Sequence, residues 1–131
     1  MVKNYQFKGT VIPYGPSNLH PAIDKGAFEA SNGSRVPLVK SFSHNPDDIV
    51  GYVDLVDSDD GVHGKIRIND EHYNVLMSVS ENDISKIHIG GYANQVVRDK
   101  KTNHIIKACV RSVAIGVDQS LVESVELYEE E

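Results

Sequence analysis

The sequence has little of what marks several classes of protein. Its only cysteine, Cys109, cannot form an internal disulfide, and its place in an apolar run is typical of a small core residue. Basic residues are outnumbered by acidic ones, 13 to 19, and the formal net charge of −6 gives no electrostatic support for nucleic-acid binding. No apolar run reaches the roughly 18 residues of a membrane-spanning helix. The N-terminus also lacks the apolar core of a secretory signal, so we expect an intracellular protein or part of a particle assembled inside a cell.

The 131 residues suit one domain, over 1–131, with a hydrophobic core. Short β-branched or aromatic segments alternate with turn-forming runs of Pro, Gly, Asn and Asp, which is typical of β proteins. Strands are expected over 5–12, 36–42, 49–56, 62–68, 84–97 and 104–117, with a strand or helical turn over 121–127. Short helices are expected over 21–30 and 71–79. This order predicts a mostly β fold, a roughly seven-stranded antiparallel barrel with about two short peripheral helices.

Local signals refine these elements. Asn69 is a candidate N-cap for the second helix, and the run 58–61 has the Asp-Gly pair of a hairpin turn. Gly90 and Gly91, in the middle of a predicted strand, indicate a bend, a bulge or the close approach of another backbone. The alternation of two strands predicts one face made of Val62, Gly64, Ile66 and Ile68, and another made of Ile106, Ala108, Val110, Ser112, Ala114 and Gly116.

A lone histidine, His44, stands at the end of the strand 36–42 and directly before the dense turn signal 45–48. Such a histidine, at the mouth of a two-stranded ribbon, is well placed to act as a base. It is equally compatible with a turn residue that faces water. The spacing alone leaves both interpretations open.

Several short motifs occur in a fixed order over residues 5–117. They are Phe7-x-Gly9, Ile-Asp-Lys-Gly-Ala-Phe at 23–28, Val-Pro-Leu at 36–38, His44, Ile-Val-Gly at 49–51 and Asp-x-x-Asp-Gly-Val at 57–62. In this combination the sequence resembles the caudoviral prohead serine proteases, which are similar in fold to the herpesvirus assemblins, a β-barrel wrapped by helices. The family cuts scaffold and capsid precursors in the immature phage head, using a serine, a histidine and a third acidic or histidine residue.

The resemblance assigns roles position by position. His44 falls on the catalytic histidine of the family, but His88 occupies the position of the nucleophilic serine, and Ser112 occupies that of the third member. Ser85 lies three residues before that position, about 10 Å away in a strand and on its opposite face. A rearranged set of Ser112, His44 and His88 is a further possibility, because such sets are defined by geometry and not by order.

A metal site is an alternative to these catalytic roles. His44 and His88, with His104, His63 or Asp47, could supply three ligands, yet no H-x-H or H-x-x-x-H pair occurs in the sequence. The acidic run 57–60 lacks the twelve-residue loop and closing glutamate of a calcium site, so a solvated turn is expected there. Neither a metal nor a cofactor is therefore expected.

The missing nucleophile favours a non-catalytic structural or assembly protein of a tailed bacteriophage virion, such as a capsid-associated, decoration or head-assembly component. The alternative is an active prohead maturation protease with a rearranged site, in which His44 acts with Ser112 or Ser85. The expected partners are capsid or other virion proteins, met through the loop 13–21 or exposed strand edges. Association into a homo-oligomer is an open alternative, and neither nucleic acid nor a membrane is expected as a partner. The expected location is the virion, after assembly in the bacterial cytoplasm.

Overall fold

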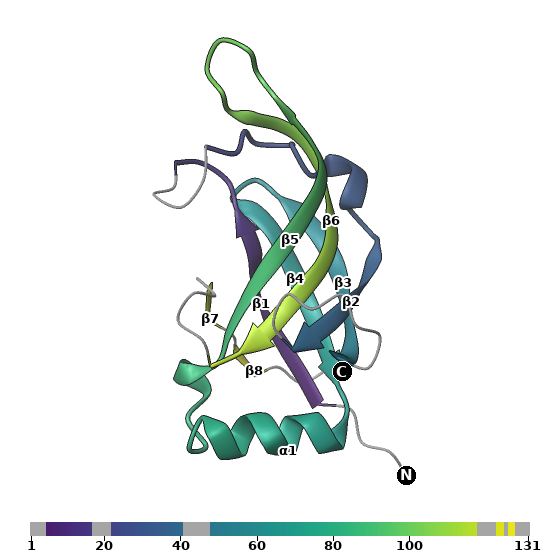
Figure 1. The fold of residues 1–131 in the computed structure, drawn as a ribbon, viewed down its shortest axis with the longest axis vertical. Coiled ribbons are helices and arrows are strands. Elements are labelled where there is room, and N and C mark those ends of the chain that lie inside the picture. Colours follow the sequence, from purple (N-terminus) through teal and green to yellow (C-terminus); the bar gives the residue numbers. More distant parts are fainter. Residues whose placement is uncertain (1–4, 17–21, 41–47, 118–122, 125, 128–131) are drawn as a thin grey trace.

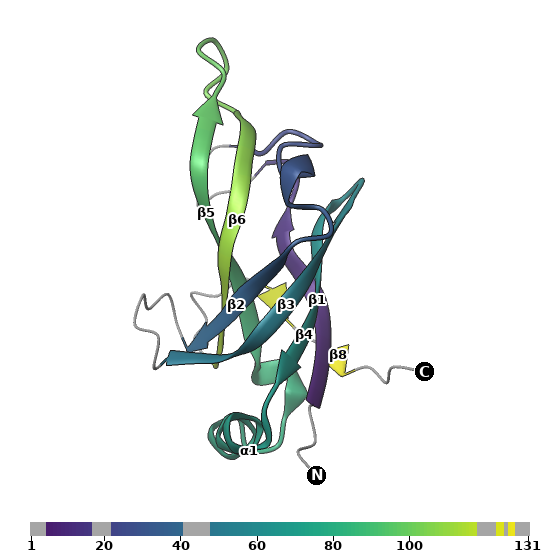
Figure 2. The same cartoon turned by 90° about the vertical axis from the view of Figure 1, so that its right-hand side faces the viewer.

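The computed structural model in Figures 1 and 2 describes residues 5–16, 22–40, 48–117, 123–124 and 126–127. In chain order its elements are β1 (Tyr5–Pro13), the 3-10 turn η1 (Glu29–Ser31), β2 (Arg35–Lys40), β3 (Ile49–Ser58), β4 (Gly61–Ile68), α1 (Asp70–Val79), the 3-10 turn η3 (Ile84–Lys86), β5 (His88–Arg98), β6 (Ile105–Gly116), β7 (Glu123–Ser124) and β8 (Glu126–Leu127). The predicted mostly β fold class is confirmed. None of the helices in these ranges is long and apolar enough to cross a membrane.

All strands belong to one sheet, in the order β7-β5-β6-β2-β3-β4-β1-β8, which curls into a half-barrel (Figure 2). Most neighbouring strands are antiparallel, as expected, but β2 and β6 run parallel. Short turns cannot set this pairing, because the whole of β3, β4, α1 and β5 separates the two strands. At the C-terminal end, β7 pairs with β5 and β8 pairs with β1, so these two short strands lie on the two outer strands of the curl.

The core lies inside the curl and receives side chains from each long strand. Fully buried examples are Phe7, Leu38, Val53, Ile66, Ile89 and Val113. Burying one such side chain stabilises the fold by about 1.5–3 kcal/mol, so these residues determine which face of each strand points inward.

The β3–β4 hairpin forms as predicted, with Ser58 paired to Gly61 across the turn. Gly61 has φ of +149°, and a Cβ atom there would lie 2.5 Å from the carbonyl oxygen of Ile12, so no other residue fits. The predicted inward face of β4 is confirmed, because Val62 and Ile66 are buried in the core.

Helix α1 closes one end of the half-barrel (Figures 1 and 2). Asn69 is its N-cap, as predicted, and its side chain accepts a hydrogen bond of 3.0 Å from the backbone N–H of His72. The helix is attached to the barrel through Leu76, which is buried, and through Tyr73, whose ring stacks on Phe7 at a centroid distance of 5.9 Å.

The helix predicted over 21–30 is wrong in the part that the structure describes. Residues 25–28 form turns, and only η1 is helical, as a single 3-10 turn. Gly26 has φ of +85°, which interrupts a right-handed helix. Ala27 and Phe28 are nevertheless buried in the core, so the apolar spacing reflected burial of a turn.

The predicted face of β6 is also wrong along part of the strand. A bulge after Tyr92 places Val110 opposite Ala93, so the inward residues change parity between Val110 and Val113. Ile106, predicted on the same face as Ala108 and Val110, is 41% exposed, whereas Ile105 is buried, and further register shifts between Asn94 and Arg98 lie opposite this part of the strand. Cys109 lies between the inward residues Ala108 and Val110, so it is half-buried rather than a core residue, and its thiol contacts Gln95 Oε1 at 3.7 Å.

Candidate functional site

His88 is the first residue of β5, directly after η3. Ile87 and Ile89 on either side of it are fully buried in the core, and because side chains alternate along a strand, His88 faces the outer surface of the sheet. Its side chain is half-buried, and the ring atom Nδ1 is enclosed without a hydrogen-bond partner. In the described part of the chain, this is one of two enclosed side-chain atoms that lack a partner.

Small and apolar residues surround His88 on the outer face. Its register partner on β6 is Gly116, and two residues further along β5, Gly90 pairs with Ala114. Ala114 pairs in turn with Val39 of β2, and these two residues form a small buried cluster apart from the main core. Within the described parts of β5, β6 and β2, no carboxylate or hydroxyl therefore adjoins His88 by register.

The other neighbour of β5 contributes a serine position that sequence reasoning missed. Ser124 of β7 is the register partner of His88. Directly opposite Cα atoms in an antiparallel pair lie about 4.5–5.5 Å apart. No motif surrounds Ser124, and only the long-range pairing of β7 with β5 reveals this juxtaposition.

Neither Ser112 nor Ser85 adjoins His88. Ser112 pairs with Tyr92 and is four residues from Gly116, about 13 Å along β6 from the partner of His88. Ser85 lies in η3, where its hydroxyl donates a 2.6 Å hydrogen bond to Asp83, so it serves the local turn. His44 and Asp47 lie outside the described residues, and their predicted roles stay predictions.

The paired glycines in β5 have a packing role at Gly91. A Cβ atom on this residue would lie 2.6 Å from Ile12 Cγ1 and 2.7 Å from Val11 Cγ1, both on β1. The close neighbours of Gly91 are thus side chains of β1, and not the other backbone that was one of the predicted alternatives.

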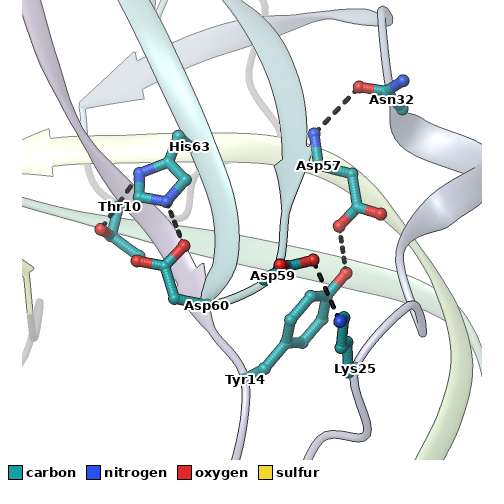
Figure 3. A network of polar contacts seen from close by, with 8 residues as sticks. All are labelled: Thr10, Tyr14, Lys25, Asn32, Asp57, Asp59, Asp60 and His63. Carbon is teal, nitrogen blue, oxygen red and sulfur yellow. Dashed lines mark hydrogen bonds and ion pairs between the residues drawn. The ribbon is translucent and has the colours of Figure 1, made fainter.

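A second group of polar side chains joins the β3–β4 hairpin to the segments around it (Figure 3). The Tyr14 hydroxyl donates a hydrogen bond to Asp57 Oδ1 and accepts one from the backbone N–H of Phe28. Burial, and then the hydrogen bond with Asp57, raise the pKa of Tyr14 from its ordinary 10.0 to about 12. The backbone N–H of Asp57 donates to Asn32 Oδ1 at 2.9 Å. These contacts hold a loop and a turn against the hairpin.

In the same group a hydroxyl, an imidazole and a carboxylate follow one another. Thr10 Oγ1 lies 3.4 Å from His63 Nδ1, and His63 Nε2 lies 2.7 Å from Asp60 Oδ1 (Figure 3). This order is that of a serine-hydrolase triad, but the contact with Thr10 is at the long limit for a hydrogen bond. The Asp60 side chain is 75% exposed, so water competes for it. The hydrogen bond from His63 lowers the pKa of Asp60, and the geometry supports a surface contact between β1 and the hairpin.

The acidic run at this turn does not converge on one point. Asp57 contacts Tyr14, Asp60 contacts His63, and Asp59 pairs with Lys25 at 3.0 Å, each in a separate contact (Figure 3). Among the residues that the structure describes, no three His, Cys, Asp or Glu side chains are grouped so that they could hold a metal ion.

Neither a family model nor a curated protein matches the sequence. The fold does match a solved structure, that of KSHV protease, a herpesvirus protein, in complex with a hexapeptide phosphonate inhibitor. The TM-score is 0.55 at 9% sequence identity, and the match covers 95% of this chain. The chain spans 65% of the length of that protease. The assemblin-like fold that the sequence motifs implied is therefore confirmed at the level of the fold.

Proposed function

We propose that the protein is a non-catalytic structural or assembly component of a tailed-bacteriophage virion, built on an assemblin-like fold. The observation that carries this proposal is the environment of His88. The family resemblance places His88 where the attacking serine belongs, and the surrounding positions on β6 and β2 carry glycine, alanine and valine.

The requirements of a general base also favour a non-catalytic role. A catalytic histidine is held in one tautomer by an acceptor at its second ring nitrogen. Nδ1 of His88 is enclosed, and it has no such acceptor in the described residues. On its β6 and β2 side, the described surface around His88 offers neither a nucleophile nor an acceptor that orients the ring, and such a surface is better suited to contact another protein than to cleave one.

Labelling with a fluorophosphonate, followed by intact-mass measurement, tests this proposal on the purified chain. We expect no adduct under conditions that fully label a reference serine protease. An adduct on Ser124, Ser112 or Ser85 that disappears in His44→Ala or His88→Ala would overturn it.

One observation favours the alternative, an active maturation protease with a rearranged site. Ser124 is the register partner of His88, so a hydroxyl-bearing residue and an imidazole-bearing residue are neighbours at the start of β5. In this case Ser124→Ala would abolish the labelling, whereas Ser112→Ala, four residues from the register partner of His88, would leave it unchanged.

The proposed place in a virion is tested on phage particles purified from the host that carries the gene. A structural component is recovered intact and at a fixed ratio to the major capsid protein. Loss of the chain from mature particles, after its presence in immature ones, would instead support the protease, because maturation proteases of the resembled family degrade themselves and leave the head.

A further inference from the structure

Strands β5 and β6 extend past the half-barrel as a two-stranded projection, which we call the arm and define as residues 92–111 (Figures 1 and 2). The pairing of the two strands is interrupted by bulges from Tyr92 onward, beyond Gly91, which lies close to Ile12 and Val11 of β1. On its β6 side Ile105, Ala108 and Val110 are still buried in the core, so the arm projects from the barrel only toward its tip.

The arm is basic, although the whole chain is acidic. Residues 92–111 contain five Lys and Arg and one Asp, a net charge of +4 against −6 for the chain, which leaves −10 on the remainder. Arg111 lies over the ring of Tyr92 at 5.8 Å. Within the described ranges, the other four cations of the arm form no ion pair. They are Arg98, Lys100, Lys101 and Lys107.

The arm also exposes apolar side chains and one strand edge. Val96 is 41% exposed, Val97 47% and Ile106 41%. The outer edge of β6 is covered by the segment 22–31, through hydrogen bonds such as that from the backbone N–H of Ala108 to the carbonyl of Ala27 at 2.9 Å. Beyond Ile89, no strand in the described residues pairs with the outer edge of β5.

The opposite end of the molecule has the complementary character. Helix α1 lies at the far end of the half-barrel from the tip of the arm (Figure 1). Residues 70–86, which comprise α1 and the turn after it, carry four Asp and Glu and one Lys, a net charge of −3. On the same helix Val75 is 52% exposed and Val79 56%. A hydrogen bond from Ser85 lowers the pKa of Asp83 and keeps that carboxylate ionised.

We propose that copies of this chain associate head to tail, with the arm of one copy bound to the α1 end of the next. Each end presents exposed valines among charges that are mostly of one sign, and the predominant signs of the two ends are opposite, so the two surfaces are complementary. The two surfaces lie at opposite ends of one chain and cannot meet within it (Figure 1). Because this contact joins two different surfaces, repetition produces a ring or an open chain of copies.

A second copy fits the arm better than nucleic acid does. A net charge of −10 on the remainder of the chain repels a polyanion that approaches the arm, whereas the acidic α1 end of another copy matches its charge. The inference goes beyond the proposed function and does not depend on it, because the two ends would associate whether or not the barrel is catalytic.

Two charge-reversed variants test the contact in sedimentation velocity runs over a range of protein concentrations at low salt. The arm variant is Lys100→Glu with Lys101→Glu, and the helix variant is Glu71→Lys with Glu81→Lys. We expect the apparent mass of the wild-type assemblies to increase with protein concentration. Each variant should raise the apparent dissociation constant at least about tenfold, which corresponds to about 1.4 kcal/mol. Lys65→Glu, in the middle of β4, is the matched control and should assemble as the wild type does.

An equimolar mixture of the two variants gives the sharpest result. The arm variant keeps a functional α1 end, and the helix variant keeps a functional arm, so the mixture should form a one-to-one dimer and stop there. A wild type that stays monomeric, or that stops at a dimer, would overturn the proposal. So would a mixture that remains monomeric, or a fluorescent DNA duplex that binds to the wild type and not to the arm variant. Circular dichroism of each variant establishes that it is folded.

Discussion

Replacing Gly91 with alanine should destabilise the fold by crowding Ile12 and Val11 of β1. The added Cβ atom would lie 2.6 Å from Ile12 Cγ1 and 2.8 Å from Ile12 Cδ1, well inside van der Waals distance. Because β1 and β5 are both held in the sheet, we expect the overpacking to cost about 1–3 kcal/mol. Ile12→Ala alone should cost about 2–5 kcal/mol, because Ile12 is buried.

The double variant distinguishes this contact from a general effect of alanine in a strand. Ile12→Ala removes two of the three crowding atoms and leaves Val11 Cγ1 at 2.7 Å, so together with Gly91→Ala it should be less destabilising than the sum of the single variants by about 1 kcal/mol. Free energies of unfolding come from urea titration followed by circular dichroism. As a matched control, Gly33→Ala strains a residue with φ of +79° that has no atom within 4 Å of an added Cβ, and it should be additive with Ile12→Ala. Additivity of Gly91→Ala with Ile12→Ala to within about 0.5 kcal/mol would refute the approach of β5 to β1.

Two further variants test the helix cap and the hairpin network. Asn69→Ala removes the acceptor of the 3.0 Å bond from the His72 N–H and should cost about 1 kcal/mol in urea titration, whereas Asn69→Asp should retain most of the stability. Tyr14→Phe removes the hydroxyl that donates to Asp57, and the loss should be about 1 kcal/mol near neutral pH, small because Tyr14 is only half-buried. The raised pKa of Tyr14 means that its contribution is complete below pH 10 and disappears as the pH rises toward about 12, so wild type and Tyr14→Phe should converge there. A constant difference across that pH range would contradict this assignment.

The elements that local signals specify were predictable from the sequence. The alternation of β4 and the turn at Gly61 required only neighbouring residues, as did the cap at Asn69. The change of face in β6 was not predictable, because it arises from a bulge that depends on the pairing with β5. The contact of Tyr14 with Asp57 joins residues 43 apart in the sequence, and no periodicity signals such a contact.

Some features of the candidate site follow from the local sequence, and others depend on long-range strand pairing. Alternation along one short segment explains why Ile87 and Ile89 lie inside and His88 outside. The neighbours of His88 could not be predicted, because Gly116 and Ser124 reach it through pairings of β5 with β6 and β7. The sequence therefore identified His88 as a candidate site residue, whereas the neighbours of His88 are determined by the tertiary fold.

The register of β5 determines which side chain stands on the outer face at its start, and packing on both sides of His88 fixes this register. A slip of one residue would turn Ile87 and Ile89 outward and remove two fully buried side chains from the core, at a cost of about 1.5–3 kcal/mol each. A slip of three residues would bring Ser85 to the position of His88, but it would move Gly91 away from Ile12, where a larger residue meets atoms within 3 Å. The strand therefore presents an imidazole, and not a serine hydroxyl, on the outer face where it begins.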